Sequence, residues 1–347
     1  EASNSTVECD GAGNTAALNA WLATNGGATA TDDCSSVAWS NNFTSLSDLC
    51  GETGSAAVIF TATDGCGNSS TTSATFTIED TTDPSIDAQA SDLTVECDGA
   101  GNTTELNDWL AAIGNTGAAS DACGGVTWSN DFAGLSDDCG ATGSATITFT
   151  ATDDCGNTST TSATFTIEDT TAPSIDTTAS DLTVECDGSG NTSDLNTWLA
   201  NNGGATASDF CAGVTWSNDF TVLSDDCGNT GSATVIFTAT DECGLTSTTS
   251  ATFTIEDTTA PSIDTTASDL TVECDGSGNT SDLNTWLANN GGASASDICA
   301  GVTWSNDFTV LSDDCGNTGS ATVIFTATDE CGLTSTTSAT FTIEDTT

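Results

Sequence analysis

Apolar positions in residues 172–259 alternate with polar ones over several short stretches, a period that predicts β-strands with one buried face. The stretches are PSIDTTASDLTVEC, GVTWSND, GSATVIFTATD and STTSATFTIED, and they are rich in Thr and β-branched residues. The first predicts a strand pair or one kinked strand. The last two flank the turn sequence Glu242-Cys243-Gly244, which predicts a β-hairpin. Such strands, separated by Gly, Asn and Asp turns, favour an all-β sandwich.

One stretch departs from this alternation. In NTSDLNTWLANNGG the apolar residues Leu195, Trp198 and Leu199 have helical spacing, with glycines at the end. This predicts a helix of about two turns capped by Thr192 or Ser193. The predicted core of this segment consists of Trp198, Trp216, Phe237 and Phe253.

The same pattern occurs four times along the chain. The string TVECDG recurs, WSN recurs, and each unit closes with ATFTIEDTT. The predicted units are residues 1–82, 83–171, 172–259 and 260–347, of which the last two differ only at Thr206/Ser294 and Phe210/Ile298. The first unit begins at Glu1, so we expect its first strand to be missing from an excerpted sequence; the alternative is a strand supplied by a neighbouring subunit.

The motif TATDxCGN, the Thr-rich strand after it and the junction (E)DTTAPSI resemble the hyalin-repeat type of immunoglobulin-like domain. The similarity covers all four units and is greatest to the HYR-like repeats of surface and gliding-associated proteins of Bacteroidota. It implies tandem immunoglobulin-like β-sandwich repeats in a cell-surface adhesive or structural array. The inserted helix and the four Cys per unit depart from a plain hyalin repeat.

Sixteen Cys in a periodic pattern indicate disulfides and an extracellular setting. Zinc is the competing use, but the chain has no CxxC pair and no His. We expect two disulfides in each repeat, joining cysteines that lie at the same end of the sandwich, because a ten-residue strand spans about 33 Å and a disulfide joins α-carbons roughly 5–6 Å apart. The predicted pairs are Cys9–Cys50, Cys34–Cys66, Cys97–Cys139, Cys123–Cys155, Cys186–Cys227, Cys211–Cys243, Cys274–Cys315 and Cys299–Cys331.

The net charge of the chain excludes some classes of binding partner. The 347 residues include 51 Asp plus Glu and no Lys, Arg or His, a net charge of −51. Phosphate recognition depends on Lys and Arg, so nucleic acid and anionic membrane surfaces are excluded as electrostatic partners. No apolar run reaches the roughly 18–20 residues of a membrane span, so membrane insertion is not expected.

Without cations of its own, the chain must solvate its carboxylates, hydrogen-bond them or bind metal. Oxygen ligands favour a hard cation such as calcium, and we expect acidic residues to gather where one repeat meets the next. The alternative is acidic turns that stay hydrated. The candidate ligands are Glu79, Asp80, Asp121, Asp153, Asp154, Glu168, Asp169, Asp209, Asp241, Glu242, Glu256, Asp257, Asp297, Asp329 and Glu330.

Covalent glycans are a second expected modification. Asp-Thr-Thr resembles the O-glycosylation acceptor of Bacteroidota, and Asn-x-Ser/Thr triplets recur. Thr for β-propensity and Asp for turns is the alternative explanation. The candidate positions are Thr81, Thr170, Thr177, Thr258, Thr265, Thr346, Asn68, Asn102, Asn157, Asn191 and Asn279.

These features predict a protein that is not an enzyme. Ser or Cys nucleophiles lack a His base, no Lys can form a Schiff base, and only a glycosidase-like carboxylate pair is left. We expect an extracellular structural array, a stalk or fibre that self-associates or continues into further repeats. An adhesin whose repeats bind surface glycans or cells, with calcium, is the alternative.

Overall fold

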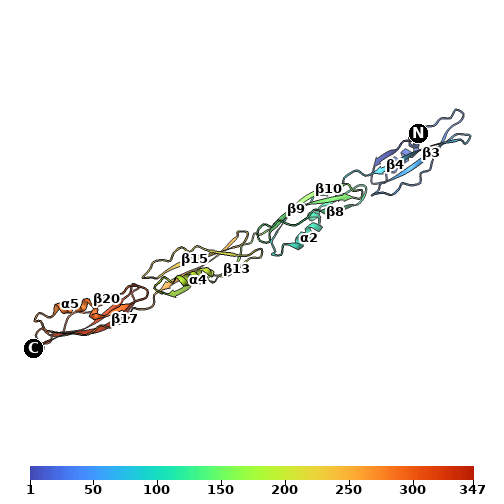
Figure 1. The fold of residues 1–347 in the computed structure, drawn as a ribbon. Coiled ribbons are helices and arrows are strands. Elements are labelled where there is room, and N and C mark those ends of the chain that lie inside the picture. The colour runs from blue at the N-terminus through green and yellow to red at the C-terminus, as the bar shows by residue number, and fades with distance from the viewer. The chain divides into compact units, whose positions relative to one another are not determined.

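The computed structural model describes residues 1–347, and one order of elements recurs along them, complete in three repeats and without the first strand pair in repeat 1 (Figure 1). Repeats 1 to 4 denote residues 1–82, 83–171, 172–259 and 260–347. Repeat 1 contains β1 (Ser5–Glu8), α1 (Thr15–Ala23), η1 (Asn25–Gly27), β2 (Ala38–Asn41), β3 (Gly54–Thr63) and β4 (Ser69–Glu79). Repeat 2 contains β5 (Ser85–Ala88), β6 (Leu93–Glu96), α2 (Thr103–Ala111), α3 (Ile113–Thr116), β7 (Ala118–Ser120), β8 (Val126–Asn130), β9 (Gly143–Asp153) and β10 (Thr158–Glu168).

The second half of the chain repeats this order. Repeat 3 contains β11 (Ser174–Thr177), β12 (Leu182–Glu185), α4 (Thr192–Ala200), η2 (Asn202–Gly204), β13 (Thr206–Ser208), β14 (Thr215–Asn218), β15 (Gly231–Thr240) and β16 (Thr246–Glu256). Repeat 4 contains β17 (Ser262–Thr265), β18 (Leu270–Glu273), α5 (Thr280–Ala288), η3 (Asn290–Gly292), β19 (Ser294–Ser296), β20 (Thr303–Asn306), β21 (Gly319–Thr328) and β22 (Thr334–Glu344).

A four-stranded sheet forms the main layer of each repeat, in the order β12-β16-β15-β14 in repeat 3. β15 and β16 form the predicted hairpin, pairing from Gly231↔Ile255 to Thr240↔Thr246. β12 runs parallel to β16, and the short β11 pairs instead with β13 in a second sheet. The first strand thus belongs to one sheet, and the second strand joins the other sheet parallel to the last strand. This is the arrangement of an immunoglobulin-like sandwich, whose second layer here is a strand pair and a helix.

The helix closes the core over the main sheet (Figure 1). Phe237 and Phe253 are fully buried, and the Trp198 ring lies 5.2 Å and 5.6 Å from theirs. Leu195 is buried beside them, while Trp216 packs against the cluster half-buried. The predicted core and helix are therefore confirmed. Every α-helix spans nine residues or fewer, and none is long and apolar enough to cross a membrane.

The predicted cap of the helix is wrong. Thr192 is already the first helical residue, and the residue before it, Asn191, has the left-handed φ of 46° that Asn tolerates better than Thr or Ser. The buried Asn191 side chain donates to Glu185 O at 2.9 Å and accepts from Asp187 N at 3.1 Å. It therefore braces the TVECDG turn instead of capping the helix.

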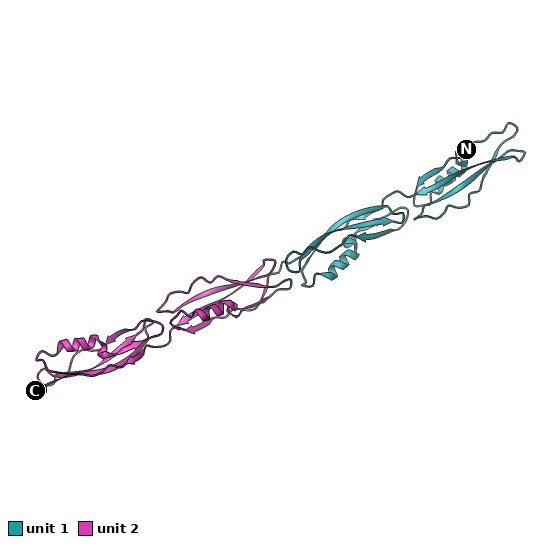
Figure 2. Ribbon diagram, in the orientation of Figure 1, with its two compact units in different colours: residues 1–170, 210–212 teal, residues 171–209, 213–347 magenta.

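The chain divides into two compact units (Figure 2). Unit 1 comprises residues 1–170 and 210–212, and unit 2 comprises residues 171–209 and 213–347. Unit 1 thus holds the whole joint between repeats 1 and 2, and unit 2 holds the joint between repeats 3 and 4.

Candidate functional site: the joints between repeats

Each repeat presents two cysteines at each of its ends. Because β12 and β16 run parallel, Cys186 lies where β12 leaves the sheet at the C-terminal end, and Cys227 precedes β15, which begins there. The hairpin turn carries Cys243 at the opposite, N-terminal end. The assignment of cysteines to ends follows from the strand directions as expected.

The predicted pairing within repeats is wrong, because the disulfides cross from one repeat to the next. Cys9 of repeat 1 bonds Cys123 of repeat 2, with α-carbons 6.0 Å apart, and Cys50 bonds Cys155, with α-carbons 5.0 Å apart. The cysteines at the C-terminal end of one repeat lie next to those at the N-terminal end of the following repeat, so they can bond across the joint. The prediction weighed distances inside one repeat and omitted its neighbour.

The same pattern continues along the chain. Within unit 1, Cys97 bonds Cys211, with α-carbons 5.8 Å apart. Within unit 2, Cys227 bonds Cys331, with α-carbons 5.2 Å apart. The rule is that the first cysteine of a repeat bonds the second of the following repeat, and the third bonds the fourth. Cys139 and Cys243 are disulfide-bonded as well.

Cys186 and Cys299 occupy the first-to-second position of the joint between repeats 3 and 4. Both are buried as thiols, and Cys299 Sγ lies 3.5 Å from Cys186 O. Burial, followed by hydrogen bonding with Cys186, raises the pKa of the Cys299 thiol. The other cysteines without a bond are Cys34, Cys66, Cys274 and Cys315.

Backbone contacts close each joint around its disulfides. Glu52 N donates to Cys123 O at 2.8 Å, and Asn229 N donates to Cys299 O at 3.0 Å. The approach is so close that a Cβ on Gly51 would meet Cys123 O, because the glycine has a φ of +54° and its Cα faces that carbonyl. Gly188 and Gly228, which follow Cys186 and Cys227, lie equally close to the backbone of repeat 4, so these joints require glycine at such positions.

A glutamate at the end of the second strand holds the chain as it leaves each repeat. Glu185 Oε1 accepts from Thr258 N at 3.0 Å and Thr259 Oγ1 at 2.8 Å, and its Oε2 accepts from Thr258 Oγ1 at 2.7 Å. The bond from the Thr258 backbone, then those from the two hydroxyls, lower the pKa of Glu185. This role of Glu185 was not predicted from the sequence, although the recurring TVECDG and EDTT strings contain both partners.

Acidic side chains meet at the joint between repeats 1 and 2. Oxygens of Asp80 and Asp121 lie within 4.8 Å of each other and of Cys123 Sγ, which is already in a disulfide. Burial, and then the charges of Asp121 and Asp153, raise the pKa of Asp80. Burial acts to raise the pKa of Asp153 too, but hydrogen bonds from Asn157, Gly156 and Cys155 together outweigh it, and that pKa is lowered. Asn157 Nδ2 donates to Asp153 Oδ2 at 2.9 Å and to Asp80 O at 3.2 Å.

The joint between repeats 3 and 4 holds a similar cluster with one difference. Oxygens of Asp257 and Asp297 lie within 4.8 Å of each other and of Cys299 Sγ. Burial, and then the charges of Asp297 and Asp329, raise the pKa of Asp257. Here Leu333 replaces the asparagine, and the buried Oδ2 atoms of Asp257 and Asp329 have no hydrogen-bond partner. Asp329 is only 5% exposed, so its unpartnered oxygen is buried at a considerable cost in solvation.

The remaining candidate ligands are placed differently. Glu79, Glu168 and Glu256 end the last strand of their repeats with exposed side chains. Asp154 Oδ2 accepts from Gly125 N at 2.8 Å inside repeat 2, and Glu242 and Glu330 are exposed. Asp169 belongs to unit 1, and Asp209 and Asp241 belong to unit 2.

Most candidate glycan positions have a structural use. Asn102, Asn191 and Asn279 are at most 3% exposed, and each amide donates to a backbone carbonyl, so the folded repeat has no room for a glycan there. The Asn68 and Asn157 amides donate to aspartates, and the hydroxyls of Thr81, Thr170, Thr258 and Thr346 donate to glutamates. Thr177 and Thr265 are exposed on short strands.

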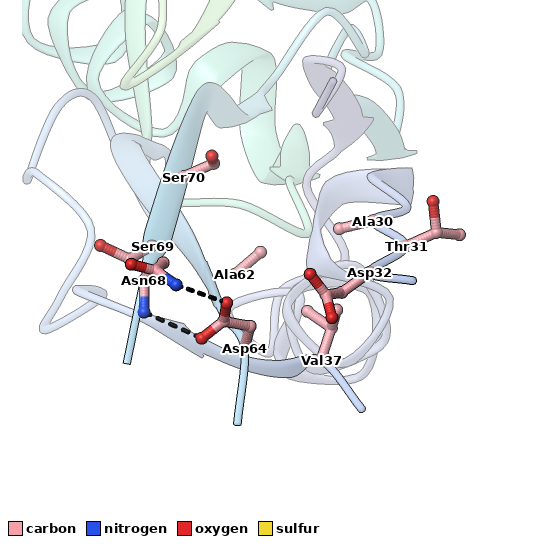
Figure 3. Close-up of a pocket in the computed structure, with 9 residues that line it drawn as sticks. All are labelled: Ala30, Thr31, Asp32, Val37, Ala62, Asp64, Asn68, Ser69 and Ser70. Carbon is pink, nitrogen blue, oxygen red and sulfur yellow. Dashed lines mark hydrogen bonds between the residues drawn. The ribbon is translucent and has the colours of Figure 1, made fainter. Parts of the chain in front are cut away.

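A pocket in repeat 1 lies where other repeats hold their first strand (Figure 3). It is lined by Ala30, Thr31 and Asp32 on one side and by Asp64 and Asn68 on the other. In repeat 2 the positions matching Ala30 and Thr31 pair with β5. This is the place of the first strand that the sequence analysis expects repeat 1 to lack.

No family model and no curated protein matches the chain, so the resemblance to hyalin-type repeats stays a prediction. Among solved structures, the protocadherin gammaB4 extracellular domain is 15% identical with a TM-score of 0.28, and the match covers 83% of this chain and 54% of that one. The chain thus spans little more than half of that ectodomain. Drosophila N-cadherin EC1-4 is 10% identical with a TM-score of 0.25, and the match covers 99% of both chains. At these values the chain is similar to extracellular cadherin repeats without taking any residue role from them.

Proposed function

We propose that the chain is a non-enzymatic extracellular structural array, a stalk or fibre segment whose consecutive repeats are covalently locked to each other. The supporting observation is the set of disulfides that cross the joints, two of them between repeats 1 and 2. A single linker leaves neighbouring domains free to swivel, whereas two bridges and a linker fix three points. Disulfides of this kind require an oxidising compartment.

Covalent bridges between consecutive repeats serve load transmission better than ligand recognition. Repeats 3 and 4 differ at two positions only, so their exposed surfaces are nearly the same. An adhesin that binds glycans or cell surfaces is the alternative. Binding of dispersed chains to immobilised glycans would favour it over the array.

Calcium is the cation that we propose for the joints. The donors are carboxylate oxygens, which suit a hard ion with about 6–8 oxygen ligands. The fit is best between repeats 3 and 4, where Asp257 and Asp329 each bury an oxygen without a partner beside Asp297. It is weaker between repeats 1 and 2, where the Asn157 amide already donates a hydrogen bond to Asp153 Oδ2. A bound ion would compensate the burial and the neighbouring negative charges that together raise the pKa of Asp257.

Glycans are a further proposed component, with Thr177 and Thr265 as the acceptors. Both follow an Asp in an Asp-Thr-Thr string, and both are exposed. On an array without cationic side chains, they would add bulk and protease resistance. The intact mass of the natural protein, compared with the 34.6 kDa of the bare chain, tests for them.

The covalent lock is tested by cutting the linker between repeats 1 and 2. Asp83-Pro84 is the one Asp-Pro bond in the chain, and this bond cleaves selectively in mild acid. After cleavage, Cys9–Cys123 and Cys50–Cys155 should hold the two fragments together on a non-reducing gel and release them on reduction. Fragments that separate without reductant would show pairing within repeats and contradict the proposal. A D83A chain treated in the same way controls for cleavage elsewhere.

A further inference from the structure

We propose that the joint between repeats 3 and 4 binds a zinc ion while Cys186 and Cys299 are thiols. The ligands are the two cysteine sulfurs and the carboxylates of Asp257 and Asp297. Oxidation of the pair to a disulfide removes the sulfur ligands and leaves only carboxylate oxygens, so the redox state of the pair selects the cation. This inference rests on the proposed function, because the site exists only where repeats 3 and 4 are joined.

The ligands come from three separate segments of unit 2 that converge at the joint. Cys186 follows β12, Asp257 follows β16, and Asp297 and Cys299 lie between β19 and β20. Oxygens of the two aspartates lie within 4.8 Å of each other and of Cys299 Sγ. The Cys186 side chain is hydrogen-bonded to the Cys299 thiol. Tetrahedral zinc sites in proteins use four ligands drawn from such sulfur and oxygen donors.

The thiols distinguish this joint from the one between repeats 1 and 2. There, oxygens of Asp80 and Asp121 meet Cys123 Sγ in the same way, but that sulfur is held in a disulfide. The thiolate is the form of cysteine that binds metal, so a disulfide leaves only the carboxylates as ligands. Thiolates select zinc, whereas carboxylates alone suit a hard cation such as calcium. One cluster of residues therefore offers two ligand sets, depending on the oxidation of its cysteines.

Two unpartnered oxygens show that this joint lacks a positive partner. The buried Oδ2 atoms of Asp257 and Asp329 have no hydrogen-bond partner, and Asp329 is 5% exposed. The charge of Asp329 acts to raise the pKa of Asp257, so the two carboxylates share one environment. In the joint between repeats 1 and 2, the Asn157 amide donates to the equivalent oxygen of Asp153. A divalent cation would supply the missing partner.

The thiols stay protonated until a cation enters. Burial, followed by the hydrogen bond with Cys186, raises the pKa of the Cys299 thiol, and the charges of Asp257 and Asp297 act in the same direction. Zinc reverses this balance, because its positive charge stabilises the thiolates beside the carboxylates. Two thiol protons are released to solvent as two Zn–S bonds form. In the competing reaction, one oxidised glutathione converts the two thiols to a disulfide and leaves as two glutathione thiols.

A pocket gives solvent access to the site. It is lined by Gly228 and Asn229 of repeat 3 and by Ile298, Cys299 and Glu330 of repeat 4. Cys299 itself is only 2% exposed, so a ligand must reach it through an opening of this kind. The amide and the carboxylate in the lining suit the passage of a hydrated cation.

The test measures whether zinc keeps the pair from closing to a disulfide. The background chain carries C34S/C66S/C274S/C315S, so that every remaining cysteine belongs to a joint. The reduced chain is treated with oxidised glutathione in zinc or in chelator, quenched in acid, denatured in chelator, alkylated and digested. In chelator the digest should contain Cys186 linked to Cys299. In zinc this linked peptide should be lost and both cysteines recovered alkylated. Cys50–Cys155 and Cys227–Cys331 should form in both samples, which shows that zinc does not block oxidation itself.

Two matched substitutions test the carboxylate ligands. Asp257→Asn keeps the oxygen that accepts from Thr259 N at 3.1 Å and removes the charge, so it should abolish the protection by zinc. Asp80→Asn is the equivalent change between repeats 1 and 2, where Asp80 Oδ1 accepts from Thr82 N at 3.2 Å. This control should leave the protection unchanged.

Cobalt(II) in place of zinc gives a spectroscopic signature of the sulfur ligands. The background chain oxidised in the presence of cobalt should show a sulfur-to-cobalt charge-transfer band in the near ultraviolet. C186S/C299S should lose this band.

Contrary outcomes separate the zinc site from the proposed function. Equal formation of Cys186–Cys299 in zinc and in chelator would overturn the inference. Protection that survives Asp257→Asn would overturn it too, because the carboxylate would then not be a ligand. The chelator digest also reports Cys9–Cys123 and Cys50–Cys155. If these bridges form and zinc protects nothing, only the zinc site fails. If they are absent, the proposed function fails with it.

Discussion

The substitution Leu333→Asn tests how much the missing hydrogen bond to Asp329, at the joint between repeats 3 and 4, lowers the stability of the chain. In repeat 2 the equivalent Asn157 donates to Asp153 Oδ2 at 2.9 Å, and the backbone matches, because Leu333 N and Asn157 N both lie 2.9 Å from their aspartate Oδ1. An asparagine at 333 should therefore reach the unpartnered Asp329 Oδ2. A hydrogen bond to a charged group contributes about 1.5–3 kcal/mol. Losing a half-buried Leu costs about 1 kcal/mol, so the free energy of unfolding should rise by about 1 kcal/mol in chelator.

Urea unfolding in chelator and in calcium measures this change, with Asn157→Leu as the reverse control. The reverse variant should lose about 2–3 kcal/mol in chelator, because it strands a buried carboxylate oxygen. In calcium the benefit of Leu333→Asn should disappear, since the ion would occupy the same oxygen. A Leu333→Asn chain that is no more stable than the unmodified one in chelator would refute the reasoning, because Asp329 Oδ2 would then carry no unmet cost.

Further predictions concern the thiols, the pH dependence and the first strand. Alkylation of denatured, unreduced monomer, followed by mass measurement, should label only Cys34, Cys66, Cys274 and Cys315, because we expect Cys186 and Cys299 to be bonded in the oxidised protein; eight disulfides within repeats would leave nothing to label. The pKa of Asp257 is raised above its ordinary 3.8, so its charge destabilises the fold at neutral pH, and this cost is relieved as the pH falls through the raised value. In chelator, Asp257→Asn should therefore melt higher than the unmodified chain at pH 7 but not near pH 4, and it should lose the gain in melting temperature with calcium. At still lower pH both chains should lose stability, because the pKa values of Glu185 and Asp187 are lowered and their hydrogen bonds disappear on protonation. Finally, adding DPSIDAQ, the sequence of residues 83–89, before Glu1 should fill the pocket of repeat 1 and raise its stability by about 1–2 kcal/mol from burial of the added Ile, whereas an Ile→Asp version of the extension should not. Protection of residues 28–32 from hydrogen exchange would report the new strand pair.

The helices and strands could be predicted from the sequence because apolar residues in each repeat recur with the spacing of a strand or of a helix. Alternation predicts β15 and β16, and the spacing of Leu195 and Trp198 predicts the helix that buries them. The cap was missed because Thr192 and Ser193 suit an N-cap by composition, while the turn before them needs a left-handed residue. That need arises from the hydrogen bond between the Asn191 amide and the Glu185 carbonyl six residues earlier, which the residue types at the start of the helix do not reveal.

The disulfide pairing could not be read from the sequence for a different reason. Strand direction places Cys186 and Cys227 at one end and leaves two solutions, pairing with each other or pairing forward into the next repeat. Because the cysteines recur at equivalent positions in every repeat, the sequence pattern fits both pairings equally well. The recurring glycine after each of these cysteines is the one signal that favours the forward solution, since it marks a surface on which another backbone rests.

Covalent joints and an entirely acidic composition explain each other. Without Lys, Arg or His, no salt bridge between side chains can hold one repeat against the next, and the joints instead bring carboxylates together. Two carboxylates about 5 Å apart repel by about 3 kcal/mol at an effective dielectric constant of about 20. A disulfide that closes a loop of about 100 residues contributes about 4–5 kcal/mol in the chain-entropy model, and Cys50–Cys155 spans 105 residues. One bridge at each joint is therefore enough to outweigh one such repulsion. Between repeats 1 and 2 the second bridge leaves a margin for the other like charges. A bound cation would add to that margin without being required for the repeats to stay joined.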